Sequence, residues 1–137
     1  MSDPRAFLSF DYDHDQTSKV LFAGQCHQDS PTPFTVADWS SKSSLPQATW
    51  EAEIRKKVGN TNMLIVLVGE FMATASGVAK EIGFANEKNV PLFGVYVNGA
   101  TSSSTLPKGL SRSTVIPWTW QGVSDMVDTC MKLGKNA

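Results

Sequence analysis

The stretch that most constrains the fold is residues 63–69, an uncharged run with the sequence MLIVLVG. Because polar and apolar positions do not alternate in it, the strand that it predicts must be buried on both faces. Such a strand is typical of the centre of a parallel sheet with helices on each side. The run therefore predicts an α/β fold.

Shorter patterns before and after this run predict further strands and helices. Apolar runs predict strands at 6–10, 34–39, 91–97 and 114–118, the second of them nearer a sheet edge. Apolar residues at helical spacing predict helices at 16–28, about 45–58, 76–89 and 122–133. Five strands and about five helices in alternation imply a flavodoxin-like, doubly wound five-stranded parallel sheet.

Length and composition set the broad class of the protein. The 137 residues are 41% hydrophobic and 18% charged, which suits a single globular domain over residues 1–137. A net charge of −1 argues against a nucleic-acid partner. No segment approaches the roughly 18 apolar residues of a membrane helix, and the N-terminus lacks a signal-peptide pattern, so we expect a cytoplasmic protein. Cys26 and Cys130 show no ligand spacing and are expected to be reduced packing residues, with no metal site.

Glu81 stands out because it follows the central strand, in the first turns of the next predicted helix. In open α/β sheets this is the edge where ligands bind. At roughly 100° per residue, Val78, Ile82 and Ala85 form the apolar stripe of the helix, and Glu81 lies beside it. We therefore expect Glu81 at the margin of the core, either as a functional carboxylate or as an ordinary helix glutamate. Phe84 is expected on the outer flank, as a lone exposed aromatic or an assembly surface.

The acidic residues that follow the first predicted strand do not form a standard metal or phosphate site. They are Asp11, Asp13 and Asp15. An EF-hand loop would need glycine and glutamate where the chain has Gln16 and Phe22. Later strand ends lack the additional carboxylates and lysine of a phosphatase. A phospho-receiver domain would need an aspartate at the end of the third strand, where the chain has Gly69 and Glu70. The acidic loop would also repel the phosphate of a flavin. These aspartates are therefore either a solvated turn or part of the same edge as Glu81.

The order and spacing of several short motifs resemble the TIR domain superfamily. These motifs are the apolar run at 6–10 with Asp15 after it, Ile54 before a buried strand, and the serine-containing turn that leads to Glu81 and Ile82. The chain is most similar to the TIR-like domains of the Thoeris anti-phage defence system. The resemblance extends from about residue 5 to residue 118.

This resemblance implies an enzyme that consumes NAD as its substrate. Catalytic TIR domains need a glutamate near the start of the helix after the third strand to cleave the nicotinamide–ribose bond, and Glu81 matches it. Nicotinamide leaves as a neutral base from a cationic glycoside, so a carboxylate that stabilises an oxocarbenium-like ribose suffices. Members of the defence family convert the ADP-ribose moiety into a signalling nucleotide that activates a separate effector protein.

The same resemblance implies which residues would line the nucleotide cleft. They follow the first and second strands and are Phe10, Asp11, Tyr12, Asp38, Trp39 and Ser40. The family often has a tryptophan four residues before the glutamate, where this chain has Gly77. Either another aromatic residue, such as Tyr12 or Trp39, covers the ribose, or the site is weakened.

Two other functions remain open from the sequence. One is a non-catalytic TIR-like module that only self-assembles or docks a partner. The other is a nucleoside deoxyribosyltransferase, because that enzyme class also places a glutamate in a related α/β fold. The resemblance also implies that homo-oligomers could complete the site. Supplying NAD and deoxynucleosides separately would distinguish the two enzymes.

Overall fold

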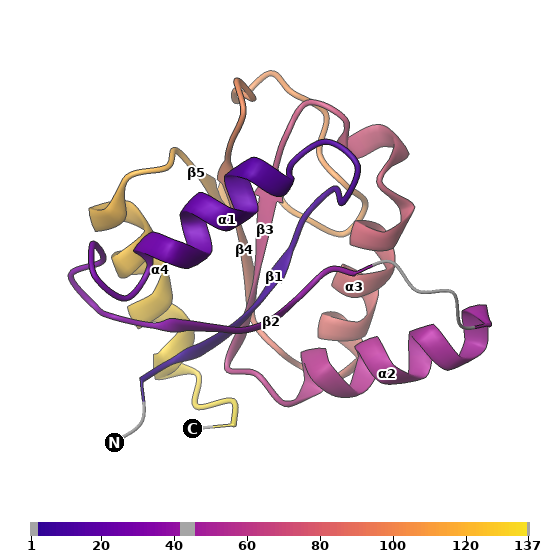
Figure 1. Ribbon diagram of the computed structural model, residues 1–137. Coiled ribbons are helices and arrows are strands. Elements are labelled where there is room, and N and C mark those ends of the chain that lie inside the picture. Colours follow the sequence, from indigo (N-terminus) through magenta and orange to yellow (C-terminus); the bar gives the residue numbers. More distant parts are fainter. Residues whose placement is uncertain (1–2, 42–45, 137) are drawn as a thin grey trace.

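The computed structural model describes residues 3–41 and 46–136 and contains a five-stranded sheet (Figure 1). The strands are β1 (Arg5–Ser9), β2 (Thr35–Trp39), β3 (Met63–Val68), β4 (Leu92–Tyr96) and β5 (Val115–Ile116). All neighbouring strands are parallel, in the order β2-β1-β3-β4-β5. This is the strand order of flavodoxin-like sheets, so the predicted fold class is confirmed.

Four α-helices cover the sheet in the described residues. They are α1 (Gln16–Gln25), α2 (Gln47–Gly59), α3 (Ser76–Glu87) and α4 (Trp120–Lys132), with short 3₁₀ helices at Met72–Thr74 and Arg112–Thr114. Helices α1 and α4 lie on one face of the sheet, and α2 and α3 on the other (Figure 1). No described helix is long and apolar enough to cross a membrane.

The connection from β4 to β5 contains a 3₁₀ turn instead of a fifth α-helix. Its residues include glycine, proline and several serines and lack an apolar helical stripe. Helix α4 begins at Trp120, two residues earlier than predicted, because the Thr119 hydroxyl accepts a hydrogen bond from the Gly122 N–H at 3.1 Å. The predicted start of α2 at Leu45 lies outside the described residues.

Strand β3 is the centre of both halves of the core, and all six of its residues are fully buried. Successive side chains point to opposite faces. Residues 63, 65 and 67 pack with α1 and α4, whereas residues 64, 66 and 68 pack with α2 and α3. Cys26 and Cys130 are free, buried thiols in the first of these clusters, as the sequence predicted.

An ion pair and a cation–π contact connect helices α2 and α3. Arg55 Nε lies 3.0 Å from Glu87 Oε2, and its guanidinium carbon lies 4.6 Å from the centre of the Phe84 ring. Phe84 is only 7% exposed. The expectation that Phe84 is an exposed aromatic was therefore wrong, because α2 covers the flank of α3 on which it lies.

The loops at the carboxyl edge of the sheet meet around a glycine at the end of β3. The Asp15 side chain is fully buried, and its Oδ1 accepts a hydrogen bond from Asn98 Nδ2 at 3.2 Å. A Cβ atom at Gly69 would lie 2.2 Å from Asp15 Oδ2. The absence of a side chain at Gly69 thus lets the loops after β1, β3 and β4 pack together.

We expect Gly69→Ala to lower the free energy of unfolding by about 1–3 kcal/mol, because the new methyl group overlaps the Asp15 carboxylate. Gly83→Ala is the matched control, since a Cβ at this α3 position meets nothing within 4 Å. Alanine there should raise stability by about 0.5–1 kcal/mol, since it favours helix more than glycine does. Urea unfolding measures the change in unfolding free energy for both variants. Equal effects of the two substitutions would contradict the packing described.

Candidate active site

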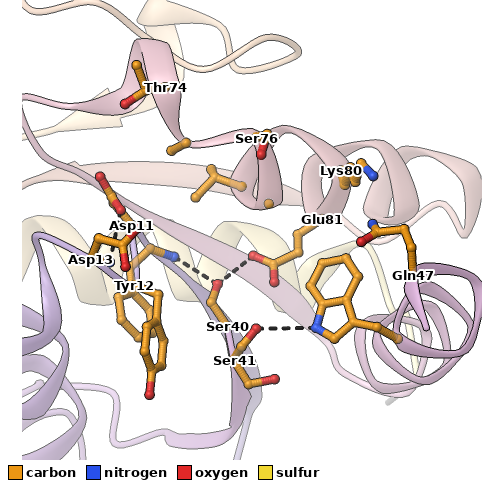
Figure 2. A pocket seen from close by; sticks show the side chains of 15 residues that line it. Asp11, Tyr12, Asp13, Ser40, Ser41, Gln47, Thr74, Ser76, Lys80 and Glu81 are labelled. Atoms are coloured by element: carbon orange, nitrogen blue, oxygen red, sulfur yellow. Dashed lines mark hydrogen bonds between the residues drawn. The ribbon is translucent and has the colours of Figure 1, made fainter. Parts of the chain in front are cut away.

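A cavity of about 380 Å³ opens at the carboxyl ends of β1 and β2, beside the start of α3. Its lining comes from residues 10–13 after β1, residues 40–41 after β2, two residues of α2, and residues 74–78 with Lys80 and Glu81. Figure 2 shows these side chains, with Ser40 between Glu81 and the loop that carries Asp11 and Asp13. The volume is in the range of small-molecule sites.

Glu81 is almost completely buried, with 1% of its surface exposed. Its Oε1 atom accepts hydrogen bonds from the Ser9 hydroxyl at 2.6 Å and the Ser40 hydroxyl at 2.5 Å. Ser9 ends β1 and Ser40 directly follows β2. The expectation that Glu81 lies at the margin of the core was wrong, because the ends of two strands provide hydroxyl groups that cover its carboxylate.

The orientation of Ser40 is fixed by the main chain. Its oxygen accepts a hydrogen bond from the Phe10 N–H at 3.1 Å while its hydroxyl donates to Glu81 (Figure 2). Ser40 is 5% exposed and Ser9 is fully buried, so bulk water competes little for either hydroxyl. The backbone directly after β1 thereby holds one oxygen of the carboxylate through a short chain of hydrogen bonds.

The second carboxylate oxygen of Glu81, Oε2, has no hydrogen-bond partner in the described part of the chain. Burial raises the pKa of Glu81 to about 7, and the hydrogen bonds from Ser40 and Ser9 only partly oppose this shift. A carboxyl group with this pKa can gain or lose a proton near neutral pH. Such a group at a cavity is typical of a catalytic acid or base.

Asp11 connects the cavity to the neighbouring loop. Its Oδ1 accepts a hydrogen bond from the Asp13 N–H at 3.0 Å, and its Oδ2 lies 2.7 Å from His14 Nδ1. The His14 ring stacks on Phe71, with 4.0 Å between ring centres. These contacts fix the loop after β1 against the loop after β3. In residues 3–41 and 46–136, no group of three His, Cys, Asp or Glu side chains could hold a metal ion.

The structure brings together some of the residues that the sequence suggested and separates others. Those that line the cavity are Phe10, Asp11, Tyr12, Ser40 and Glu81. Asp38 and Trp39 are not among the lining residues. Asp38 Oδ1 lies 3.7 Å from Lys57 Nζ, and the ring of Trp39 lies 3.9 Å from Lys19 Nζ. Both belong to the edge strand β2, which is only partly covered.

Sequence analysis missed the roles of Ser9 and Trp50. Trp50 shares the helical spacing of Ile54 and Val58 and is partly buried against the same apolar cluster. It also lines the cavity, and its indole N–H donates a hydrogen bond to the Ser41 carbonyl oxygen at 3.2 Å. The polar N–H of Trp50 could have suggested this contact, because a partly buried indole normally needs a hydrogen-bond acceptor.

Comparison with known proteins identifies the family. The family model described as "Thoeris protein ThsB, TIR-like domain" matches residues 7–102 and so includes every residue of the cavity. The chain belongs to this family. The match confirms the resemblance to the TIR-like domains of the Thoeris system that was found in the sequence.

Other comparisons add less than the ThsB family match. A search of the curated proteins found no match. Among solved structures, the chain is similar to a 3-dehydroquinate dehydratase-like protein from Bifidobacterium longum. The identity is 14% and the TM-score 0.45, with 97% of this chain and 98% of that chain covered. Similarity at this level carries no information about activity.

We expect Glu81→Gln to stabilise the protein increasingly as pH rises. The folded-state pKa of about 7 lies above the ordinary value of 4.5, so ionisation of Glu81 costs no stability at pH values well below 4.5. The cost grows as pH rises toward the folded-state pKa and is complete above it. The glutamine variant lacks this ionisation. Its advantage in unfolding free energy should reach about 3 kcal/mol at high pH.

Urea unfolding between about pH 4.5 and pH 8.5 covers this range of ionisation. Glu53→Gln is a suitable control, because Glu53 is an exposed residue of α2. The difference between Glu81→Gln and the unchanged protein should grow with pH, while the control shows no such trend. The same pH dependence for both variants would show that the Glu81 carboxyl is not desolvated in the folded protein.

Proposed function

We propose that this protein cleaves the nicotinamide–ribose bond of NAD, with Glu81 as the catalytic carboxylate. The observation that carries the proposal is the environment of Glu81. The carboxylate is buried at a cavity, with one oxygen held by two serine hydroxyls and the other without a partner in the described residues. Membership of the ThsB family supports the proposal, because catalytic TIR domains need a glutamate at the position of Glu81.

The proposed reaction begins with cleavage of the bond between C1′ of the ribose and the pyridinium nitrogen. The bonding electron pair stays on nicotinamide, which leaves as a neutral molecule, and positive charge develops on C1′ and the ring oxygen. The ionised Glu81 would stabilise this charge in a site where little water screens it. Oxygen Oε1 is fixed by Ser9 and Ser40, which leaves Oε2 to interact with the ribose.

The second step transfers the ribosyl group to an acceptor. A hydroxyl oxygen forms a new bond to C1′, and its proton passes to Glu81, whose pKa of about 7 suits a base at neutral pH. Water as acceptor gives ADP-ribose, and a hydroxyl group of the same nucleotide gives a cyclic product. We propose that the product is an ADP-ribose-derived signal that diffuses to a separate effector protein, and that homo-oligomers are the active form.

We expect the purified protein to release nicotinamide from NAD in a Glu81-dependent manner, with or without lysate from phage-infected cells. Chromatography would detect nicotinamide, and the mass of the accompanying nucleotide would identify the product. The rate should increase with pH through about 7 as Glu81 ionises, because kcat/KM follows the ionisation of the free enzyme. Glu81→Gln should remove activity, whereas Glu53→Gln should retain it.

Three results would contradict this proposal. Activity that persists in Glu81→Gln would assign the chemistry to another group. Cleavage of deoxynucleosides without cleavage of NAD would indicate a nucleoside deoxyribosyltransferase. No release of either base from folded protein, even with infected-cell lysate, would favour a docking module and leave Glu81 without a catalytic role.

A further inference from the structure

We infer that Trp50 is the stacking platform for the pyridinium ring of the substrate, and that it selects a positively charged ring over a neutral one. The inference deepens the proposed function, on which it rests, by naming a specificity-determining residue in the same cavity. Trp50 would contact the ring that leaves, whereas Glu81 would act on the ribose.

Trp50 is held in a fixed relation to the catalytic carboxylate. Its indole N–H donates to the Ser41 carbonyl oxygen at 3.2 Å, and the preceding residue, Ser40, donates its hydroxyl to Glu81 at 2.5 Å. Trp50 and Glu81 both line the cavity. Two adjacent residues after β2 therefore hold the indole and the carboxylate at the same cavity.

The other aromatic candidates are less suited to stack on the leaving ring. Trp39 does not line the cavity, and Lys19 Nζ lies 3.9 Å from the centre of its ring. Tyr12 lines it, but its ring stacks on Phe10 with 6.2 Å between ring centres. At Gly77 a Cβ atom would meet nothing within 4 Å, so α3 leaves space there instead of a ring. Trp50 is thus the indole that the described cavity offers.

The charges around the cavity favour a cationic group over an anionic one. Among its described lining residues, the acidic ones are Asp11, Asp13 and Glu81, and the only basic one is Lys80. Lys80 is itself close to a carboxylate, with Nζ 3.4 Å from Glu51 Oε1. Tryptophan attracts cations more strongly than the other aromatic side chains, particularly where water is excluded. A pyridinium ring can both stack on the indole and interact favourably with the acidic lining, whereas a neutral dihydropyridine or free nicotinamide can only stack.

This arrangement has a consequence for product release. When the C1′–N bond breaks, the electron pair returns to the ring nitrogen and the ring loses its positive charge. The cation–π attraction to Trp50 ends at that moment. The platform would therefore hold the reacting ring more tightly than the released nicotinamide, and nicotinamide would leave readily.

The test uses 1-methylnicotinamide, a pyridinium that keeps its charge and has no ribose to lose. Titration into the unchanged protein should quench tryptophan fluorescence and produce a charge-transfer absorption band at longer wavelength than tryptophan itself. Neutral nicotinamide should produce no such band. The band should disappear in Trp50→Phe and remain in Trp39→Phe, which serves as the matched control outside the cavity. Trp50→Phe should also raise KM for NAD about tenfold without lowering kcat, because the cation–π attraction acts on the bound pyridinium and is lost as the bond breaks.

Each outcome decides between the two proposals. No band in the unchanged protein, or a band that survives in both Trp50→Phe and Trp50→Tyr, would overturn the role of Trp50. Glu81-dependent cleavage of NAD with an unchanged KM in Trp50→Phe would also overturn it and leave the proposed function intact. A Trp50-dependent band in a protein that does not cleave NAD would support the platform and reject the glycosidic chemistry.

Discussion

The two serine hydroxyls that donate to Oε1 of Glu81 connect the ends of two strands to α3. Ser9 and Ser40 come from neighbouring strands, and Glu81 lies 72 and 41 residues away from them in sequence. Burial of a carboxyl group is unfavourable unless hydrogen bonds compensate for lost water. Here only one of its two oxygens is compensated by the described residues, and the pKa is raised. The fold tolerates this because β3 and the clusters on both of its faces supply a large apolar core.

The hydrogen bonds made by the residues after β1 and β2 also shape the cavity. The Phe10 N–H fixes Ser40, Ser40 holds Glu81, and the next residue, Ser41, fixes Trp50. The groups that would act on ribose and on the leaving ring are therefore positioned by the carboxyl ends of β1 and β2. A rigid parallel sheet is a good support for such a site, because catalysis depends on groups that are oriented before the substrate binds. In the proposed reaction nicotinamide leaves as a neutral molecule, so no general acid would be needed and a single carboxylate would be sufficient.

Much of the fold could be predicted from the sequence, because the uncharged run 63–69 predicts a strand buried on both sides. The position of Glu81 after this strand also drew attention to it. Its burial could not be predicted, since the geometry of one helix does not reveal which strand ends cover it. The burial of Phe84 could not be predicted either, because it depends on contacts with another helix, α2. The role of Trp50 depends on its bond to Ser41, a contact that helical spacing within α2 cannot show.

The most direct measurement of the central claim is a carbon NMR titration of the Glu81 side-chain carboxyl, assigned by comparison with Glu81→Gln. The account predicts a midpoint near pH 7, since burial outweighs the two serine hydrogen bonds. A midpoint near the ordinary value of 4.5 would contradict it. That result would mean that water reaches the carboxylate in solution, and that Glu81 is an ordinary helix glutamate rather than the desolvated group on which the site depends.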